Sequence, residues 1–258
     1  SRPVVAFFDT LGDTIIEMVH LIMKLAPIGV FALLARVSAS LGQDFEQLGD
    51  LAGEFGLYML AVVLGLLLHG ILVYLPLIKF VAKQPIGRFL KALSPAQLLA
   101  FSSSSSGATL PVTIDCVEKR EGVHEEASSF VLPLGATINM DGTALYQAVA
   151  AVFIAQALDL GLDLAAQLTI VLTAVLASIG TAAVPGAGII MLVIILEAVG
   201  VPSAGIALIL GVDRILDMLR TVTNVTGDAT VATVVAASEG QLGEVNLSEE
   251  EDRIVVAA

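Results

Sequence analysis

The sequence is poor in cysteine, in histidine and in charged residues, and each shortage excludes a class of protein. A single cysteine, Cys116, excludes an internal disulfide and a cysteine-based metal cluster. The three histidines, His20, His69 and His124, are far apart and lack the spacing of metal ligands. Only 12 lysines and arginines face 25 aspartates and glutamates, which leaves a net charge of −13. Because no basic patch could meet phosphates, a nucleic-acid-binding protein is excluded.

Hydrophobic residues, in contrast, are abundant. They make up 57% of the chain, the mean hydropathy is +0.93, and charged residues are 14%, against about 25% in an ordinary soluble domain. Several apolar runs reach the length of roughly 20 residues that a membrane-spanning helix needs. We therefore expect a multi-pass helical protein of the cell (inner) membrane. Its apolar surface would contact the lipid bilayer.

The first part of the chain predicts two membrane helices followed by a basic connector. Residues 14–41 and residues 51–78 are long apolar stretches of helical character. The connector Lys79–Lys91 then carries four of the 12 basic residues. Because loops rich in lysine and arginine stay in the cytoplasm, this connector is expected on the cytoplasmic side.

Two segments predict helical hairpins that enter the membrane and return to the same side. The first contains the serine run Ser102–Gly107, which lies between the basic connector and a second basic loop at Lys119. A single straight span would separate the two loops, whereas a re-entrant hairpin over about residues 89–118 keeps both in the cytoplasm. The segment 180–188 (GTAAVPGAG) has the same form and predicts a second hairpin over about residues 164–199. Non-helical backbone at membrane depth is tolerated where it lines a cavity.

A serine run of this kind is, in isolation, equally typical of a flexible linker. The apolar segments on both sides, and the ATLP sequence that closes the run, favour the hairpin tip. Serine hydroxyl and backbone N–H groups at such a tip would line a binding site.

Each hairpin is followed by a helix that polar residues interrupt. Residues 123–158 predict a long helix broken at Asn139–Thr143 (NMDGT), and residues 204–236 predict the last helix. Paired interrupted segments in two halves indicate the binding site of a secondary transporter. The expected fold is thus an all-α polytopic membrane protein, an inverted-repeat transporter with two re-entrant helical hairpins and broken helices. An acidic cytoplasmic tail, residues 238–258, follows.

The last helix carries the strongest functional signal. Its polar residues recur at i, i+4, i+7, i+8, i+11 and i+15, which places them on one stripe: Asp213, Asp217, Arg220, Thr221, Asn224 and Asp228. A charge at the centre of a membrane helix costs about 2.5–3.5 kcal/mol on insertion scales, so the stripe needs partners or a wet cavity. One arginine among three carboxylates leaves negative charge that suits a cation such as Na⁺. Arg220 offers a planar fork for a carboxylate ligand. The alternative is an internal salt-bridge network without a ligand.

The break at Asn139–Thr143 predicts a second polar site. Gly142 permits an unwound turn, whose freed carbonyls would join Asp141 in an oxygen-rich site for a hard cation. A glycine-induced kink with a capped end is the alternative. It would not by itself explain an aspartate placed between apolar neighbours such as Met140 and Leu145.

Four motifs in this order resemble the dicarboxylate/amino acid:cation symporter family, the sodium-coupled glutamate and aspartate transporters. They are SSSSSGATLP, LPLGATINMDGTALYQ, TAVLASIGTAAVPGAG and LDMLRTVTNVTGD. The likeness runs from about Phe7 to Ala236, nearly the whole chain.

The resemblance implies roles for single residues. The substrate would be contacted by Ser104 (through its backbone), Ser106, Thr143, Val184, Gly188, Asp217, Arg220, Thr221 and Asn224. Within this set Asp217 would hold the substrate ammonium and Arg220 its side-chain carboxylate. One sodium ion would lie among Gly135, Asn139, Asn224 and Asp228, a second at carbonyls of Thr137, Ser178, Ile179 and Thr181, and a third at Asn139 and Asp141. Two to three Na⁺ ions and no organic cofactor are thus expected.

The resemblance also implies an elevator-type homotrimer. Residues 1–50 would be a scaffold-type membrane helix with an outer loop, and residues 51–237 the transport domain. The family's first four helices are absent, so we expect a fragment of a longer protein. Gln147 stands where potassium-exchanging members tend to have glutamate, and Ala183 replaces a common glycine of the second tip.

The sequence thus predicts a symporter that moves an acidic amino acid or a C4-dicarboxylate with Na⁺. An enzyme is not expected: an intramembrane aspartyl protease using Asp141 and Asp228 would need a YD pair and a GxGD pattern. The chain has no YD pair, and Val225 occupies the first glycine position of that pattern. An anion channel is the other alternative, and a steep sodium dependence of substrate binding would separate it from a transporter.

Overall fold

The computed structural model describes residues 45–243 and six single helical positions before them: Phe7, Thr10, Thr14, Met18, Leu21 and Ile28. Side chains are described from residue 53 onward within the continuous part. Most of the predicted first membrane helix, and the tail from residue 244, lie outside the described residues. Within the described part the secondary structure is helical, apart from one isolated antiparallel bridge between Val123 and Leu242. The all-helical class is therefore confirmed.

The first described helix is longer than the sequence predicts. Helix α2 spans Phe45–His69 and continues as two π-helical turns, η1 (Gly70–Tyr74) and η2 (Leu77–Val81). Pro76 lies between these turns and has no N–H to donate, which interrupts the regular ladder. The helical stretch thus extends to Val81 rather than ending at Ile78.

Hairpin 1 consists of α3 (Ile86–Ser103), α4 (Ser106–Asp115) and the π-helical turn η3 (Cys116–Arg120). Its turn falls in the serine run: Ser104 adopts a left-handed conformation with φ 55°, and Ser105 is extended. The Ser105 side chain accepts a hydrogen bond from the Ala108 N–H at 3.1 Å, which caps α4. The serine run is therefore an ordered turn and not a linker.

Hairpin 2 consists of α7 (Leu164–Ile179) and α8 (Ala187–Ala198). Asp163 caps α7 by accepting from the Ala166 N–H at 2.7 Å. The chain enters α8 through Gly186, whose φ of 75° lies in the region that favours glycine. The turn between the helices contains the GTAAVPG sequence.

The segment between the hairpins is a broken helix. Helix α5 (Glu125–Ile138) ends at Asn139, and α6 (Asp141–Ala157) begins after Met140. Neither Asn139 nor Met140 has helical dihedral angles, so the chain unwinds at the NMDGT sequence for these two residues.

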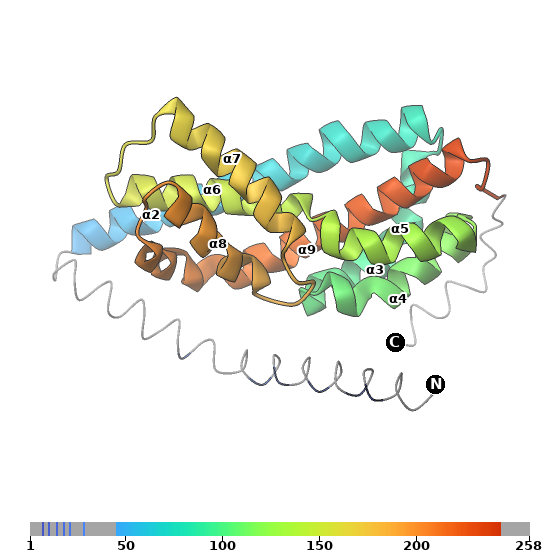
Figure 1. Ribbon diagram of the computed structural model, residues 1–258, viewed down its shortest axis with the longest axis horizontal. Coiled ribbons are helices and arrows are strands. Elements are labelled where there is room, and N and C mark those ends of the chain that lie inside the picture. Colours follow the sequence, from blue (N-terminus) through green and yellow to red (C-terminus); the bar gives the residue numbers. More distant parts are fainter. Residues whose placement is uncertain are drawn as a thin grey trace.

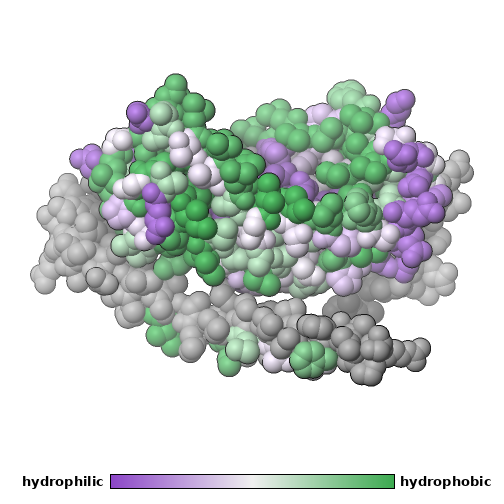
Figure 2. All heavy atoms as spheres, in the orientation of Figure 1, coloured by the Kyte–Doolittle hydropathy of each residue, from purple (hydrophilic) through white to green (hydrophobic). Residues whose placement is uncertain are grey.

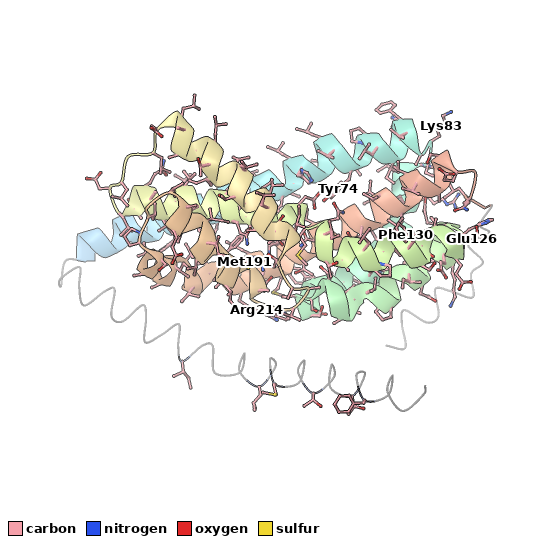
Figure 3. The ribbon with its side chains drawn as sticks, viewed as in Figure 1. Tyr74, Lys83, Glu126, Phe130, Met191 and Arg214 are labelled. Carbon is pink, nitrogen blue, oxygen red and sulfur yellow. The ribbon has the colours of Figure 1, made fainter. Side chains whose placement is uncertain are left out.

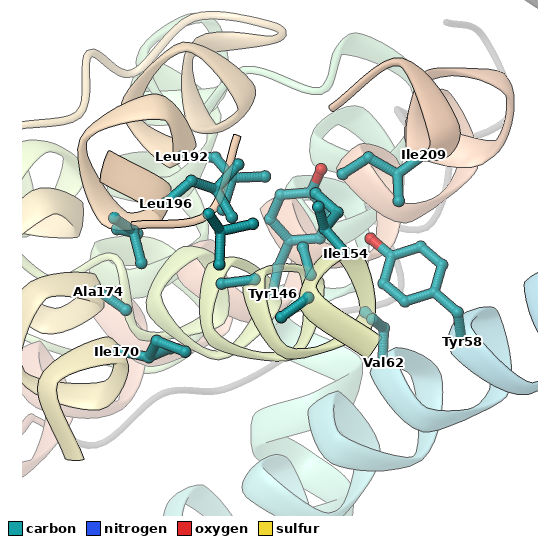
Figure 4. Packing of buried hydrophobic residues seen from close by; sticks show 14 of the residues in the cluster. Tyr58, Val62, Tyr146, Ile154, Ile170, Ala174, Leu192, Leu196 and Ile209 are labelled. Atoms are coloured by element: carbon teal, nitrogen blue, oxygen red, sulfur yellow. The ribbon is translucent and has the colours of Figure 1, made fainter. Parts of the chain in front are cut away.

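Helix α9 (Ile206–Ser238), preceded by the short 3₁₀ turn η4 (Ser203–Gly205), runs along the length of the molecule and contacts both hairpins (Figure 1). Its first half packs into one hydrophobic cluster with α2, α6, α7 and α8 (Figure 4). Its second half packs into another with α3, η3 and α5. The polar residues Asp217–Asn224 fall between Leu216 of the first cluster and Val225 of the second.

The outer surface is apolar along the middle and polar at the ends. Figure 2 shows hydrophobic residues over the middle of the visible face, with hydrophilic residues gathered toward both ends. Two stretches of the described residues are long and apolar enough to cross a membrane, Gly53–Val81 and Glu125–Ala157. The first is mostly exposed, with Leu57, Leu64 and Leu72 on its outer face. An apolar belt between polar ends is the surface that a bilayer solvates.

Candidate functional site

Every residue that the resemblance assigns to the substrate lines one small cavity, where the two hairpin tips meet α9. The cavity also includes Met140 and Thr181–Ala183, which the sequence did not predict as substrate contacts. Its lining is Ser104, Ser106, Met140, Thr143, Thr181, Ala182, Ala183, Val184, Gly188, Asp217, Arg220, Thr221 and Asn224. The sequence places these residues far apart, and four elements of the fold bring them together.

An ion pair between Arg220 and Asp217 dominates the electrostatics of the cavity. Both side chains are buried, at 3% and 1% exposure respectively, and Arg220 Nη2 donates to Asp217 Oδ1. The second carboxylate oxygen of Asp217 accepts from the backbone N–H of Gly186 at 2.9 Å. Hairpin 2 is thus held down on α9 by the carboxylate that is expected to bind a substrate ammonium.

The position of the Arg220 guanidinium is fixed by neighbours from α6 and α8. The guanidinium lies over the ring of Tyr146, 4.7 Å from its centroid, and the Tyr146 hydroxyl donates to Asp213 Oδ1 at 2.6 Å. At Gly188 a Cβ atom would lie 2.1 Å from Arg220 Nη1, so the guanidinium occupies space that only glycine leaves free. Gln147 Nε2 donates to the Gly188 carbonyl at 2.9 Å.

Sequence reasoning missed the supporting roles of Tyr146 and Gln147. Both are fully buried on α6, directly after the NMDGT break. The polar stripe of α9 did include Asp213, but its partner on another helix has no signature in the sequence. Only the packing of α6 on α8 and α9 reveals this support.

Several buried polar atoms around the cavity have no hydrogen-bond partner among the described residues. They are Ser104 Oγ, Gln147 Oε1, Arg220 Nη1 and Asn224 Oδ1. Buried polar groups are normally paired, and an unpaired one costs about 1–3 kcal/mol. Arg220 Nη1 can only donate and Asn224 Oδ1 can only accept. The cavity therefore suits a ligand that carries both an acceptor, such as a carboxylate, and a donor.

The two hairpin tips contact each other directly beside the cavity. The Ala183 carbonyl of hairpin 2 accepts from Ser105 Oγ at 2.7 Å and from the Gly107 N–H at 3.1 Å. The sequence predicted substrate contacts at Ser104 and Ser106 and gave Ser105 no role. In the structure Ser105 caps α4 and also joins the tips.

Three of the four residues predicted for the first sodium ion lie in direct contact. Asn139 Nδ2 donates to Asp228 Oδ1 at 3.0 Å. At Gly135 a Cβ atom would lie 2.6 Å from the same oxygen, so glycine is required for this approach of α5 to α9. Asn224 lies one helical turn before Asp228 and donates to Thr143 Oγ1 at 3.0 Å.

Asp141 has partners that the sequence did not predict. Its Oδ2 lies 2.7 Å from His69 Nε2 and also accepts from the Tyr74 hydroxyl, while its Oδ1 accepts from the Gly142 N–H at 3.0 Å. Figure 3 shows Tyr74, the last residue of η1, near the middle of the molecule. Asp141 is therefore an anchor between α6 and the end of α2, a role that its position after a helix break did not indicate.

The residues predicted for the second sodium ion lie at the ends of two helices that pack together, α5 and α7. Thr181 is buried, and its N–H donates to the Ser178 carbonyl at 3.1 Å, in the last turn below the hairpin 2 tip. Thr137 and Ile179 are exposed. The structure thus groups Ser178, Ile179 and Thr181, with Thr137 on the neighbouring α5.

Comparison with known proteins identifies the family. Residues 1–238 match the model of the sodium:dicarboxylate symporter family. The chain belongs to this family. It is 45% identical to excitatory amino acid transporter 1 of Homo sapiens over 230 residues, which are 89% of this chain and 42% of that protein. It is 46% identical to the protein of the same name from Ambystoma tigrinum over 89% of the chain.

A third relative, excitatory amino acid transporter 3 of Oryctolagus cuniculus, is 45% identical over 249 residues, 95% of this chain and 46% of that protein. The chain thus spans less than half the length of these curated relatives. The family and the names of the relatives describe transporters and not enzymes. The predicted family is therefore confirmed, and the protease alternative is set aside.

Proposed function

We propose that this chain contains the substrate- and ion-binding part of a sodium-coupled symporter for an acidic amino acid, glutamate or aspartate, or for a C4-dicarboxylate. The observation that carries the proposal is the buried Arg220–Asp217 pair in a cavity that both hairpin tips close. A buried cation and anion side by side, next to unpaired donors and acceptors, match an amino acid with a second carboxylate. Family membership and the names of the relatives support the same substrate class.

Substrate binding exchanges ionic partners at Arg220 and Asp217. The two side chains neutralise each other, and the cavity between the tips is small. A bound aspartate would place its side-chain carboxylate against Arg220 and its ammonium against Asp217. Each buried charge would then keep an opposite charge nearby, so the exchange avoids leaving an unpaired charge in a dry site.

Sodium ions, as co-substrates, would bind at Asp228 with Asn139, Asn224 and the Gly135 carbonyl, and at the carbonyls of Thr137 and the end of α7. A third would use Asp141. Carboxylate, amide and carbonyl oxygens are ligands that suit a hard cation. Because Asn224 lines the substrate cavity and lies one turn from Asp228, sodium and substrate would share a boundary. That shared residue is the physical basis for coupling.

Transport would follow an elevator mechanism in the membrane, within a homotrimer. Hairpins 1 and 2 would be the re-entrant, inverted-repeat elements of a transport domain formed by residues 51–237. Residues 1–50 would belong to a scaffold and residues 238–258 to the cytoplasmic tail. The Arg88–Glu121 contact, in which Arg88 Nη2 donates to the Glu121 carbonyl at 3.2 Å, supports the hairpin because it joins the two basic loops at one end.

Calorimetric titration of aspartate into the purified full-length protein, with and without sodium, tests the proposal. Binding should appear only with sodium and strengthen steeply as sodium rises.

Arg220→Ala should abolish aspartate binding and leave sodium binding measurable, whereas Asp228→Asn should weaken both. Aspartate affinity retained in Arg220→Ala would refute the assigned role. Succinate binding without aspartate binding would assign the site to dicarboxylates, and binding independent of sodium would overturn the symport.

A further inference from the structure

One carboxyl group outside the site is deeply buried and has no hydrogen-bond partner in the part of the chain that the structure describes. Glu121 follows η3 at the base of hairpin 1 and is 1% exposed. Neither of its carboxylate oxygens has a hydrogen-bond partner among the residues that the structure describes. It lies between the two apolar stretches Gly53–Val81 and Glu125–Ala157 and outside both. A buried ionised carboxylate without partners is costly, so this position favours the neutral acid.

The nearest cation does not relieve this cost. Arg88 Nη2 donates to the backbone carbonyl of Glu121 at 3.2 Å and not to its carboxylate. Arg88 Nε is buried and has no hydrogen-bond partner within the described residues. Burial raises the pKa of Glu121 from 4.5 to about 7, and the Arg88 charge opposes this shift only in part. Ionisation of Glu121 would thus occur near neutral pH.

Charged groups on the elements packed against η3 mostly have partners or face solvent. Arg88 of α3 is the charge that acts on the Glu121 carboxyl. Lys91, Glu125 and Glu239 are exposed. Three other charged groups are paired: Lys119 with Asp115, Glu118 with Ser128, and Glu126 with Gln241. Of the other titratable groups nearby, His124 is exposed and Arg120 is half-buried.

Glu121 lies where hydrogen bonds join three segments of the chain. The next residues bind the segment after α9: the His124 N–H donates to the Gln241 carbonyl at 3.0 Å, and the Gly243 N–H donates to the Gly122 carbonyl at 2.8 Å. On the other side Arg88, at the start of α3, binds the Glu121 carbonyl. Lys83 and Glu126, which flank this region in the sequence, lie at the same end of the molecule in Figure 3. Water drawn in by an ionised Glu121 would enter among these contacts.

We propose that Glu121 is a proton-binding site at the base of hairpin 1, and that loss of its proton loosens the contacts among α3, η3 and the segment after α9. The site is separate from the substrate cavity and does not depend on the proposed transport function. Its effect would be to make the rigidity of the hairpin 1 base depend on the pH at that face of the membrane.

The sign of the effect on stability follows from the burial. The folded protein holds the Glu121 proton more tightly than the unfolded chain does, so the contribution of Glu121 to stability is greatest at low pH and falls as pH rises from about 4.5 to about 7. The test is thermal unfolding of the full-length protein by circular dichroism, without sodium or aspartate, from about pH 5 to about pH 8. Wild type should lose several degrees in melting temperature over this range relative to Glu121→Gln, and the two should agree at low pH.

Glu125→Gln is the matched control, because it removes an exposed carboxylate four residues further on, at the start of α5, and should follow the wild-type profile. Parallel melting curves for wild type and Glu121→Gln at all pH values would overturn the proposal. Hydrogen exchange at residues 122–124 and 241–243 gives a local readout. At high pH it should be faster in wild type than in Glu121→Gln, and equal rates would count against loosening.

Infrared pH-difference spectra measure the proton itself. A carboxylic-acid band should disappear near neutral pH in wild type and be missing from Glu121→Gln. Arg88→Gln should move the midpoint to higher pH, because the arginine charge favours the ionised form. A band that titrates below about pH 5, as an exposed glutamate does, would refute the assignment.

Discussion

In hairpin 1 the turn is fixed largely by its own serines, whereas in hairpin 2 it is fixed by residues of other elements. Ser105 caps α4 through Ala108, and its own N–H donates to Ser103 Oγ at 3.2 Å. The turn of hairpin 2 instead relies on Asp217 for Gly186 and on Ser105 and Gly107 for Ala183. A turn that is held by hydrogen bonds from other elements is expected to open when those bonds are lost.

The two hairpin tips also differ in how deeply they are buried. Ser104, Ser105 and Ser106 at the first tip are buried, while Ala183–Gly186 at the second are only half-buried. On α7 the outer face carries exposed Leu164, Leu168 and Leu172. Fewer contacts make local opening cheaper. This difference predicts that hairpin 2 opens more readily than hairpin 1, and three substitutions test this comparison.

Asp217→Asn should have the largest effect. The amide can still accept from Gly186, but Arg220 loses the carboxylate with which it is paired, and breaking a buried ion pair costs about 3–5 kcal/mol. We expect a lower melting temperature, faster proteolysis in residues 180–186 and loss of aspartate binding. Asp163→Asn is the control, because it removes an exposed charge from the same hairpin and keeps a capping side chain. Unchanged cleavage of hairpin 2 in Asp217→Asn would show that Asp217 does not keep hairpin 2 closed.

Gly188→Ala should weaken substrate binding with a smaller loss of stability. Its Cβ would lie 2.1 Å from Arg220 Nη1, so the guanidinium must move. Displacement of a positioned group by about 1 Å can cost on the order of 100-fold, and we expect a loss of aspartate affinity of that size by calorimetry. At Gly180, in the same hairpin, a Cβ meets nothing closer than 3.7 Å. Equal affinities of Gly188→Ala and Gly180→Ala would contradict this geometry.

Ser105→Ala should have the smallest effect. Loss of an N-cap costs about 1 kcal/mol, which for a chain of this size lowers the melting temperature by about 2–4 °C. The bond to Ala183 is lost as well, so hairpin 2 should become easier to cleave. Ser102→Ala removes an exposed hydroxyl from the same run and should leave both readouts unchanged. Hairpin 2 cleavage that does not respond to Ser105→Ala would show that the tips act independently.

Spacing along one helix and local sequence account for the polar stripe and the helix break, whereas the other site residues were implied by the resemblance to the symporter family. The stripe Asp217–Asp228 follows from helical periodicity, because residues three, four or seven apart share a face regardless of what packs against them. The break at Asn139 follows from the local NMDGT sequence. Tyr146 and Gln147, in contrast, look like ordinary helix residues, and their support of Arg220 depends on how α6 packs on α9 and α8.

The sequence by itself determined the helical membrane class, the family, and which residue types could meet an acidic substrate and a cation. These properties depend on composition and on local order, which are read along the chain. Only the tertiary structure decided that Asp217 is shared between Arg220 and Gly186, that Ser105 joins the tips, and that Glu121 is buried without a hydrogen-bond partner from residues 45–243. Such contacts join residues that are distant in sequence, and their energies depend on the exclusion of water, which packing alone sets.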